Sequence, residues 1–571
     1  MFKRSSSGRR SGTVVGVSMT SLNGTDNPGF SNTENGGLSN GHAQNGRVSI
    51  ISDKASMQNL FITPNAKESS SSILNADFSG IIPTDNLNSQ TPTPNGNGPS
   101  VQRQISTVEM KKSINLLHCT AIMVAVTGHS SIFVSPSFIL NLSGSVGATL
   151  VVWLIGGLIN LGMALCFAEL GTMFPKAGGP YSYTMKSFGP LMGFLIMWGY
   201  TVLIAGPFWA FLAYTAALYI VKPVFPNCTT GQIDTAVNLL AGWIMITMVI
   251  LNCVYMKYVT KVQTLLSGSK LLVLLLIIGA GIYNLAKGKT ENFEAPFATT
   301  TTEPGKFALA IFYSIFSYGG WQVMTTLLEE VKDPARDPPR SVYISFAIVI
   351  SKYIMTNVAY ITLLTPAEIV GSSAVASLFI DRLYSPLVVV VSVFVALTSI
   401  GALNASIMGH SRLLFAGARN GHMPQILGMV HAKYLTPWPS IFVYLAWGLV
   451  MLFTGGVADM MEFISLFSTI MGIVVIASLL YLRWKMPNEK RPYQTMLFVP
   501  IVEIVVNIAI LVLGIYQKPQ KMGIGLAILF AGIPVYWFGV LWKSKPKEFT
   551  EIVDGLTLTA QKLFLLTKVK K

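Results

Sequence analysis

Two polar interruptions in apolar segments carry the residue types best suited to bind a small polar molecule. One interruption is Tyr318-Gly319-Gly320. It lies at the centre of Phe307–Glu330, a segment that is apolar and long enough to cross a bilayer. Paired glycines cost about 1 kcal/mol each in a helix interior. Lipid offers no water to a freed backbone, so such a break persists where it lines a cavity. The segment therefore predicts a broken helix that binds a ligand through its backbone, with a packing kink as the alternative.

The second interruption lies in the middle of the first apolar segment. It is the run TGHSS at residues 127–131. Helix N-termini present free N–H groups that suit a carboxylate, and unwound carbonyls suit an ammonium. Secondary transporters with inverted repeats break corresponding helices in their two halves. In a five-plus-five arrangement the first and sixth spans correspond, and these are the two segments with breaks.

The composition is that of a membrane protein with many spans. Hydrophobic residues make up 51% of the 571 residues, charged residues 11%, and the mean hydropathy is +0.54. The net charge of +15 comes mostly from short loops beside apolar spans, which indicates membrane topology and not nucleic-acid binding. The polar first hundred residues predict no cleavable signal peptide. The sequence contains no metal-ligand cluster or phosphate-binding loop, so we expect no cofactor, no metal and no enzymatic activity.

Twelve segments meet the length of about 20 apolar residues that a membrane-spanning helix needs. Basic residues gather in alternate loops, so the positive-inside rule places both termini in the cytoplasm. An even number of spans agrees with that topology. The expected spans are 114–140, 146–170, 190–221, 238–256, 262–285, 306–328, 341–365, 386–415, 439–456, 460–482, 496–516 and 522–542.

Three regions are expected along the chain. Residues 1–107 are rich in Ser, Asn, Gly, Thr and Pro, which predicts a disordered cytoplasmic tail, either plain or phosphorylated at its Arg-Ser patches. Residues 108–543 form the twelve-span domain, and 544–571 form a cytoplasmic C-terminal tail. The end of that tail, Gln561–Lys571, is either an amphipathic segment on the inner leaflet or a frayed end.

Two single residues also stand out. Lys270 lies inside the fifth span, where a charge is costly and is a functional candidate by default, with snorkelling as the alternative. Cys228 is in a predicted extracellular loop, whereas Cys119, Cys166 and Cys253 fall within spans. An extracellular cysteine without a partner in its own chain indicates an intermolecular disulfide or a free thiol.

A series of motifs runs in order along residues 108–540. They are IFVSP at 132–136, AELG at 168–171, KAGGPY at 176–181, FSYGGW at 316–321, EEVKDP at 329–334, SRL at 411–413, ARNGHMP at 418–424, LTPWPS at 435–440 and Arg491-Pro492. Together they resemble the L-type amino acid transporters, the light chains of heteromeric amino acid transporters in the amino acid–polyamine–cation superfamily. The resemblance implies an all-α membrane protein with a LeuT-like five-plus-five inverted repeat. It also implies sodium-independent exchange of amino acids, large neutral or aromatic ones, by alternating access.

The resemblance implies that the two breaks form the substrate site. The substrate carboxylate would meet the backbone of Ser130 and Ser131. The substrate amine would meet the carbonyls of Thr127, Phe316 and Gly319, and Phe316 would also close over the substrate as a gate.

The resemblance gives Lys270 and Cys228 roles as well. The Lys270 ammonium would stand where sodium-coupled relatives of the fold place a sodium ion. Cys228, which follows the KPVFP pattern at 222–226, would join a single-span glycoprotein heavy chain through a disulfide. The implied location is the plasma membrane.

One departure from the family lies in the first break. His129-Ser130-Ser131 stands where the family has Gly-Ser-Gly. The added side chains narrow the site and remove glycine's conformational freedom, while the hydroxyls add donors. His129 is either a packed neutral imidazole or a proton-sensitive group in the permeation path. Two alternative functions therefore stay open: a uniporter or proton-linked carrier of another small organic amine or cation, and a transport-poor sensor or scaffold.

Overall fold

Long apolar helices dominate the part of the chain that this computed structural model describes. That part comprises residues 114–174, 179–226, 228, 230–323, 325, 328, 331–542 and 544–568. All of it belongs to one of the chain's two units, Thr63–Lys571. The predicted tail at 1–107 and the motif residues 176–178, 329 and 330 lie outside the described residues.

The α-helices are α2 (Leu116–Val126), α3 (Ser135–Ser143), α4 (Val146–Met173), α5 (Gly179–Phe188), α6 (Pro190–Gly199), α7 (Gly206–Val221), α8 (Thr230–Val254), α9 (Met256–Ala286), α10 (Pro304–Ser317), α12 (Asp337–Ile361), α13 (Pro366–Gly371), α14 (Val375–Tyr384), α15 (Val388–Arg419), α16 (Trp438–Thr454), α17 (Val457–Lys485), α18 (Phe498–Gln517), α19 (Pro519–Phe530), α20 (Gly532–Tyr536) and α21 (Lys547–Phe564). Short 3₁₀ turns are η4 (Ser130–Phe133), η6 (Glu291–Phe293), η7 (Trp321–Val323), η9 (Ser385–Leu387) and η10 (Gln425–Gly428), and two π-helical turns are η5 (Tyr200–Ala205) and η11 (Trp537–Leu541). The strands are β1 (Met429–His431) and β2 (Leu566–Lys568).

Nine helical segments within the described residues are long and apolar enough to cross a membrane. The three remaining predicted spans are the first, the sixth and the ninth. The ninth is α16, one apolar helix of 17 residues. The first is divided into α2, η4 and α3, and the sixth into α10 and η7, which is why neither forms a long helix. The predicted all-α membrane fold, with interruptions in spans one and six, is confirmed.

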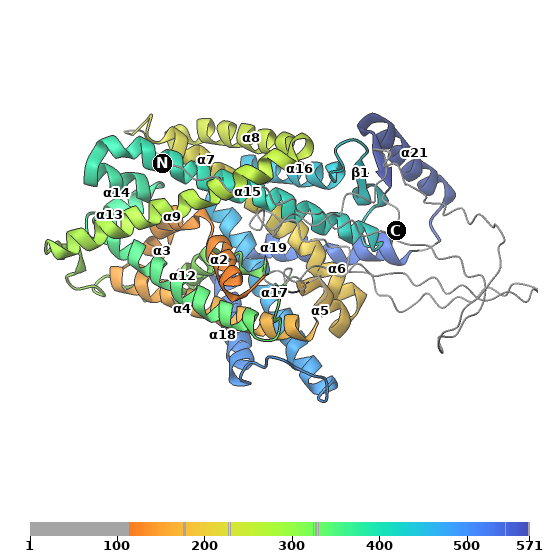
Figure 1. The fold of residues 1–571 in the computed structure, drawn as a ribbon, viewed down its shortest axis with the longest axis horizontal. Coiled ribbons are helices and arrows are strands. Elements are labelled where there is room, and N and C mark those ends of the chain that lie inside the picture. Colours follow the sequence, from red (N-terminus) through yellow and green to blue (C-terminus); the bar gives the residue numbers. More distant parts are fainter. Residues whose placement is uncertain are drawn as a thin grey trace, which may run out of the picture. The chain divides into compact units, whose positions relative to one another are not determined.

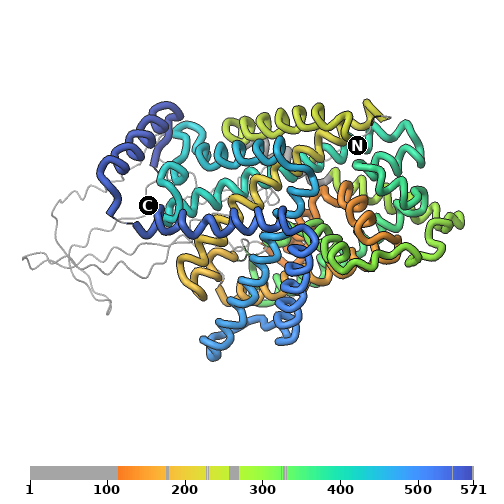
Figure 2. Tube along the Cα trace, turned by 180° about the vertical axis from the view of Figure 1, so that it is seen from behind, coloured from red at the N-terminus to blue at the C-terminus, as the bar shows by residue number. Residues whose placement is uncertain are grey.

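Close packing around α4 brings the interrupted spans into the interior. The N-cap Ser145 begins α4 by accepting a hydrogen bond from the Ala148 N–H at 3.3 Å. Gly156 on this helix faces Ser314 of α10, and a Cβ at the glycine would overlap that serine side chain. Small residues allow such close approach between helices in membranes. Figure 1 shows α2 at the near face of the bundle, and α2 packs on α12 while α3, which is mostly buried, packs on α10. Figure 2 shows the same helices from behind.

The described part of the C-terminal segment contains a helix and a strand. α21 begins well before Gln561, and the chain then forms β2, which pairs antiparallel with β1 in the loop between α15 and α16. The register aligns Met429 with Lys568 and His431 with Leu566. This pairing joins segments far apart in sequence, and hydrophobic periodicity carries no signal for it.

Candidate functional site

The break in span one depends on Gly128. Helix α2 ends at Val126, and Gly128 adopts φ +68°, a left-handed conformation that favours glycine. A Cβ at this position would overlap the Tyr353 hydroxyl. Glycine therefore satisfies both the backbone conformation and the close approach of α12, and the chain can resume as η4 at Ser130.

The break in span six meets the break in span one. Helix α10 ends at Ser317, and Gly320 has φ +102°. A Cβ at Gly320 would lie only 2.6 Å from the Val126 carbonyl oxygen, so there is no space for a side chain. The Gly128 N–H donates to the Gly319 carbonyl at 2.8 Å. The Ser131 hydroxyl reaches the Ser317 carbonyl at 3.5 Å. The two interruptions that the sequence predicted thus lie against each other.

Lys270 of α9 holds the end of α2. Its ammonium donates to the Thr127 carbonyl at 3.2 Å and the Ala125 carbonyl at 3.4 Å, and also to the Gly128 carbonyl. The side chain is buried. The last carbonyls of a helix lack partners within it and carry the negative end of its dipole, so a cation here is stabilising. The snorkelling alternative is wrong, because the amine binds carbonyls in the interior.

His129 fills a space lined by aromatic rings. Its imidazole centroid lies 4.7 Å from those of Phe208 and Phe316 and 6.1 Å from that of Phe211. The side chain is only 7% exposed. Phe208 and Phe211 come from α7 and were not predicted as site residues, because aromatic residues in an apolar span carry no distinguishing signal. Of the two interpretations of His129, the packed imidazole matches this geometry.

The first break also carries buried polar atoms without a partner. Among the described residues, Thr127 Oγ1, His129 Nδ1 and Ser130 Oγ are buried and make no hydrogen bond. Leaving a buried polar group unpaired costs about 1–3 kcal/mol. Three such atoms within four residues mark a place where a bound molecule's polar groups would find partners. Of the other predicted residues, Phe316 packs on the His129 ring, Gly319 lies beside that ring, and Ser131 contacts the end of α10.

Tyr353 is a further residue that the sequence did not single out. It lies on α12 and its hydroxyl donates to the Ser317 carbonyl at 3.3 Å. Its ring packs on Tyr318 and Trp153, with centroids 5.0 Å and 5.5 Å away. Tyr353 thereby stabilises the backbone at the break in span six through contacts with Ser317 and Tyr318. Tyrosines are common in apolar spans, so the sequence gives no signal that Tyr353 contacts the end of α10.

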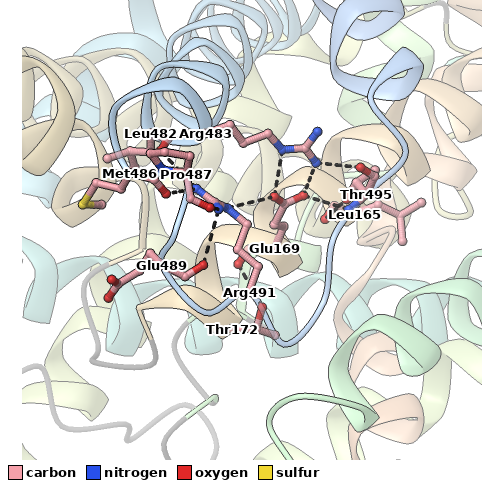
Figure 3. Close-up of polar contacts among 10 residues, drawn as sticks. All are labelled: Leu165, Glu169, Thr172, Leu482, Arg483, Met486, Pro487, Glu489, Arg491 and Thr495. Carbon is pink, nitrogen blue, oxygen red and sulfur yellow. Dashed lines mark hydrogen bonds and ion pairs between the residues drawn. The ribbon is translucent and has the colours of Figure 1, made fainter.

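A buried ion pair joins the ends of α4 and α17 to the loop between α17 and α18 (Figure 3). Glu169 of α4 is fully buried and accepts two hydrogen bonds from Arg483 of α17, at 2.9 and 2.5 Å. It also accepts from the Thr495 N–H at 2.8 Å, and Arg491 lies 3.9 Å away. In the sequence, Glu169 and Arg491 stand out only as parts of motifs. A charge inside an apolar span was the signal that could have singled out Glu169.

Cys228 is the most accessible of the four cysteines. It is half-buried, while Cys119, Cys166 and Cys253 are buried, and all four are free thiols in the structure. Its carbonyl accepts a hydrogen bond from the Lys222 amine at 2.7 Å. The described residues contain no group of three or more His, Cys, Asp or Glu side chains that could hold a metal ion.

Comparison with known proteins identifies the family. Residues 114–540 match the amino acid permease family. The chain is 37% identical over 465 residues to the large neutral amino acids transporter small subunit 2 of Mus musculus, covering 80% of this chain and 86% of the relative. It is 35% identical over 460 residues to the human Asc-type amino acid transporter 1 (80% and 87%) and 33% identical over 476 residues to the human cystine/glutamate transporter (83% and 94%).

These matches agree with the motifs and with the architecture. The multi-pass all-α bundle with breaks in spans one and six has the LeuT-like fold that the resemblance implied. The relatives are named as transporters of amino acids, and one of them as a small subunit. The chain therefore belongs to the amino acid permeases and, within them, to the L-type amino acid transporter family of heteromeric amino acid transporter light chains.

Proposed function

We propose that this protein exchanges amino acids across the membrane by sodium-independent alternating access, as the light chain of a heterodimer. The observation that carries the proposal is the Lys270 ammonium, which binds three carbonyls at the end of α2. A fixed cation at this point supplies the positive charge that a bound sodium ion would otherwise provide. No coupling ion is then needed to hold the broken helix.

The substrate site lies where the two breaks meet. The substrate carboxylate binds the backbone N–H groups of Ser130 and Ser131, and its amine binds carbonyls of Thr127, Phe316 and Gly319. The unpaired Thr127 and Ser130 hydroxyls are additional polar partners. We propose large neutral or aromatic amino acids as substrates, in keeping with the motifs and with the name of the mouse relative.

The membrane topology follows from the charge distribution. We propose the plasma membrane as the location, with both termini in the cytoplasm. Basic residues in alternate loops and at the adjoining helix ends support this orientation, among them Arg340 in the first turn of α12 and Arg419 at the end of α15.

The first experiment measures uptake into liposomes that contain the purified protein, without sodium, with and without unlabelled amino acids inside. Uptake of a labelled amino acid that requires the internal load supports exchange. Uptake into empty vesicles indicates the uniporter alternative, and dependence on external pH indicates proton coupling. If no amino acid shows saturable uptake, the result supports the sensor or scaffold alternative.

Replacing His129 with glycine is expected to speed uptake of large neutral amino acids. The imidazole packs between Phe208 and Phe316, so its removal enlarges the space beside both breaks. His129→Phe is the matched control, because it retains the ring and its packing but not the nitrogens. Rates for a series of side-chain sizes, at two pH values, test this. Equal rates for His129→Gly and the unmodified protein across all substrates would contradict it.

The proposed heavy chain is joined through Cys228. Cys228→Ser is expected to abolish the covalent heterodimer on a non-reducing gel while leaving the light chain folded, since the side chain is half-buried in a loop. Cys253→Ser is the matched control, because that thiol is buried in α8. A covalent complex that persists in Cys228→Ser would show that another thiol makes the bond.

A further inference from the structure

The C-terminal helix α21 has an apolar face that the described protein leaves uncovered. Phe549, Ile552, Val553, Leu556 and Leu563 are between 40% and 71% exposed, and no residue of the helix is buried. Their separations of three, four and seven residues place them on one side of a helix. An exposed apolar stripe of this kind indicates an interaction surface.

The opposite side of α21 is polar. It carries Lys547, Glu551, Asp554 and Lys562. The one apolar residue there is Leu558, which lies about 200° around the helix from Leu556. Separation into an apolar and a charged side is typical of helices that lie in the interface of a membrane.

Both ends of α21 are attached close to membrane-spanning helices. At its start, only residues 542–546 separate it from η11, the end of the last span. At its other end, β2 pairs with β1, and the Phe564 ring lies 5.9 Å from that of Phe442 on α16. Figures 1 and 2 show α21 set apart from the bundle and connected to it beside β1.

The attachment points restrict how the helix can lie. Eighteen residues make a helix about 27 Å long. Because both of its ends are held near the ends of spans, the helix stays close to this end of the bundle. The exposed aromatic side chains of Trp537, Phe538 and Trp542 lead from the last span toward it, and such residues favour the level of the lipid headgroups.

We propose that α21 binds the membrane surface at this end of the bundle, with its apolar face in the boundary between headgroups and acyl chains. Under the proposed topology this is the cytoplasmic leaflet. Between the last span and α21, the exposed side chains of Trp537 and Trp542 supply aromatic groups suited to the same level of the membrane. Through β2, the membrane-bound helix also holds the loop between α15 and α16.

A pair of labelled leucines tests the orientation. Leu556→Cys and Leu558→Cys, each in the Cys228→Ser background, are labelled with an environment-sensitive fluorophore in the full chain. The protein is reconstituted in phosphatidylcholine vesicles with and without lipids that carry a shallow nitroxide. At Leu556 we expect emission at shorter wavelength and strong quenching by the nitroxide lipid. At Leu558 we expect emission typical of water and little quenching.

Other outcomes overturn the proposal. Equal, water-like emission at both positions means that the apolar face is not in lipid. Short-wavelength emission at Leu556 without nitroxide quenching means that a protein surface, from a second copy or a partner, covers the face.

A second pair of variants tests the energetics. Leu556→Glu should increase amide hydrogen exchange across residues 547–564 in vesicles, because a charge on the apolar face opposes binding to the interface. The same change at Leu558 should leave exchange unaltered. Identical exchange in the two variants, whether raised or unchanged, would contradict a lipid-bound apolar face.

Discussion

Uptake of amino acids is expected to fall by about tenfold or more when Lys270 is replaced with methionine. The ammonium donates to the carbonyls of Ala125, Thr127 and Gly128 in the interior. Methionine fills much of the same space but donates nothing. Each buried acceptor left unpaired costs about 1–3 kcal/mol, and 1.4 kcal/mol corresponds to a factor of about ten. Initial rates in sodium-free liposomes, normalised to reconstituted protein, give the measurement.

Alanine at Lys270 distinguishes a cationic role from a purely structural one. Lys270→Ala vacates the space in front of the three carbonyls, whereas methionine occupies it. Sodium should therefore restore uptake in Lys270→Ala more than in Lys270→Met, because hard cations bind oxygen ligands. Unimpaired uptake in both variants without sodium would refute the proposed role of the ammonium.

The free energy of unfolding is expected to drop by about 3–5 kcal/mol when Glu169 is replaced with alanine. This carboxylate is fully buried and binds Arg483 through both oxygens and the Thr495 N–H through one of them. Its removal leaves the Arg483 guanidinium, itself largely buried, without its counter-charge. The midpoint of thermal unfolding in detergent, followed by loss of the monodisperse peak, measures the change.

An exposed ion pair serves as the matched control for Glu169. Arg382 pairs with Glu368 outside the spans, and its side chain is 57% exposed. Breaking an exposed pair typically costs about 1 kcal/mol or less, so Arg382→Ala should shift the midpoint far less than Glu169→Ala. Equal shifts of the unfolding midpoint in the two variants would show that burial does not strengthen the ion pair between Glu169 and Arg483.

The breaks were predictable from sequence because their chemistry is local. The glycine pair in span six and the polar run in span one are exceptional inside apolar spans. Lys270 is exceptional because it places a charge inside span five. The ring of phenylalanines around His129 was not predictable, since Phe208 and Phe211 resemble any lipid-facing residue in α7. The partners of Glu169 lie more than 300 positions away. Only the folded chain brings such distant residues together.

The β1–β2 pair also bears on how the protein should be handled in the laboratory. Truncation after the last span would remove β2 and leave the edge of Met429–His431 without its strand partner. Unpaired strand edges invite pairing with other chains. A shortened protein would therefore tend to associate through this loop. A purification tag is better placed beyond Lys568, behind a flexible linker, so that the fused sequence does not compete for the edge of β1.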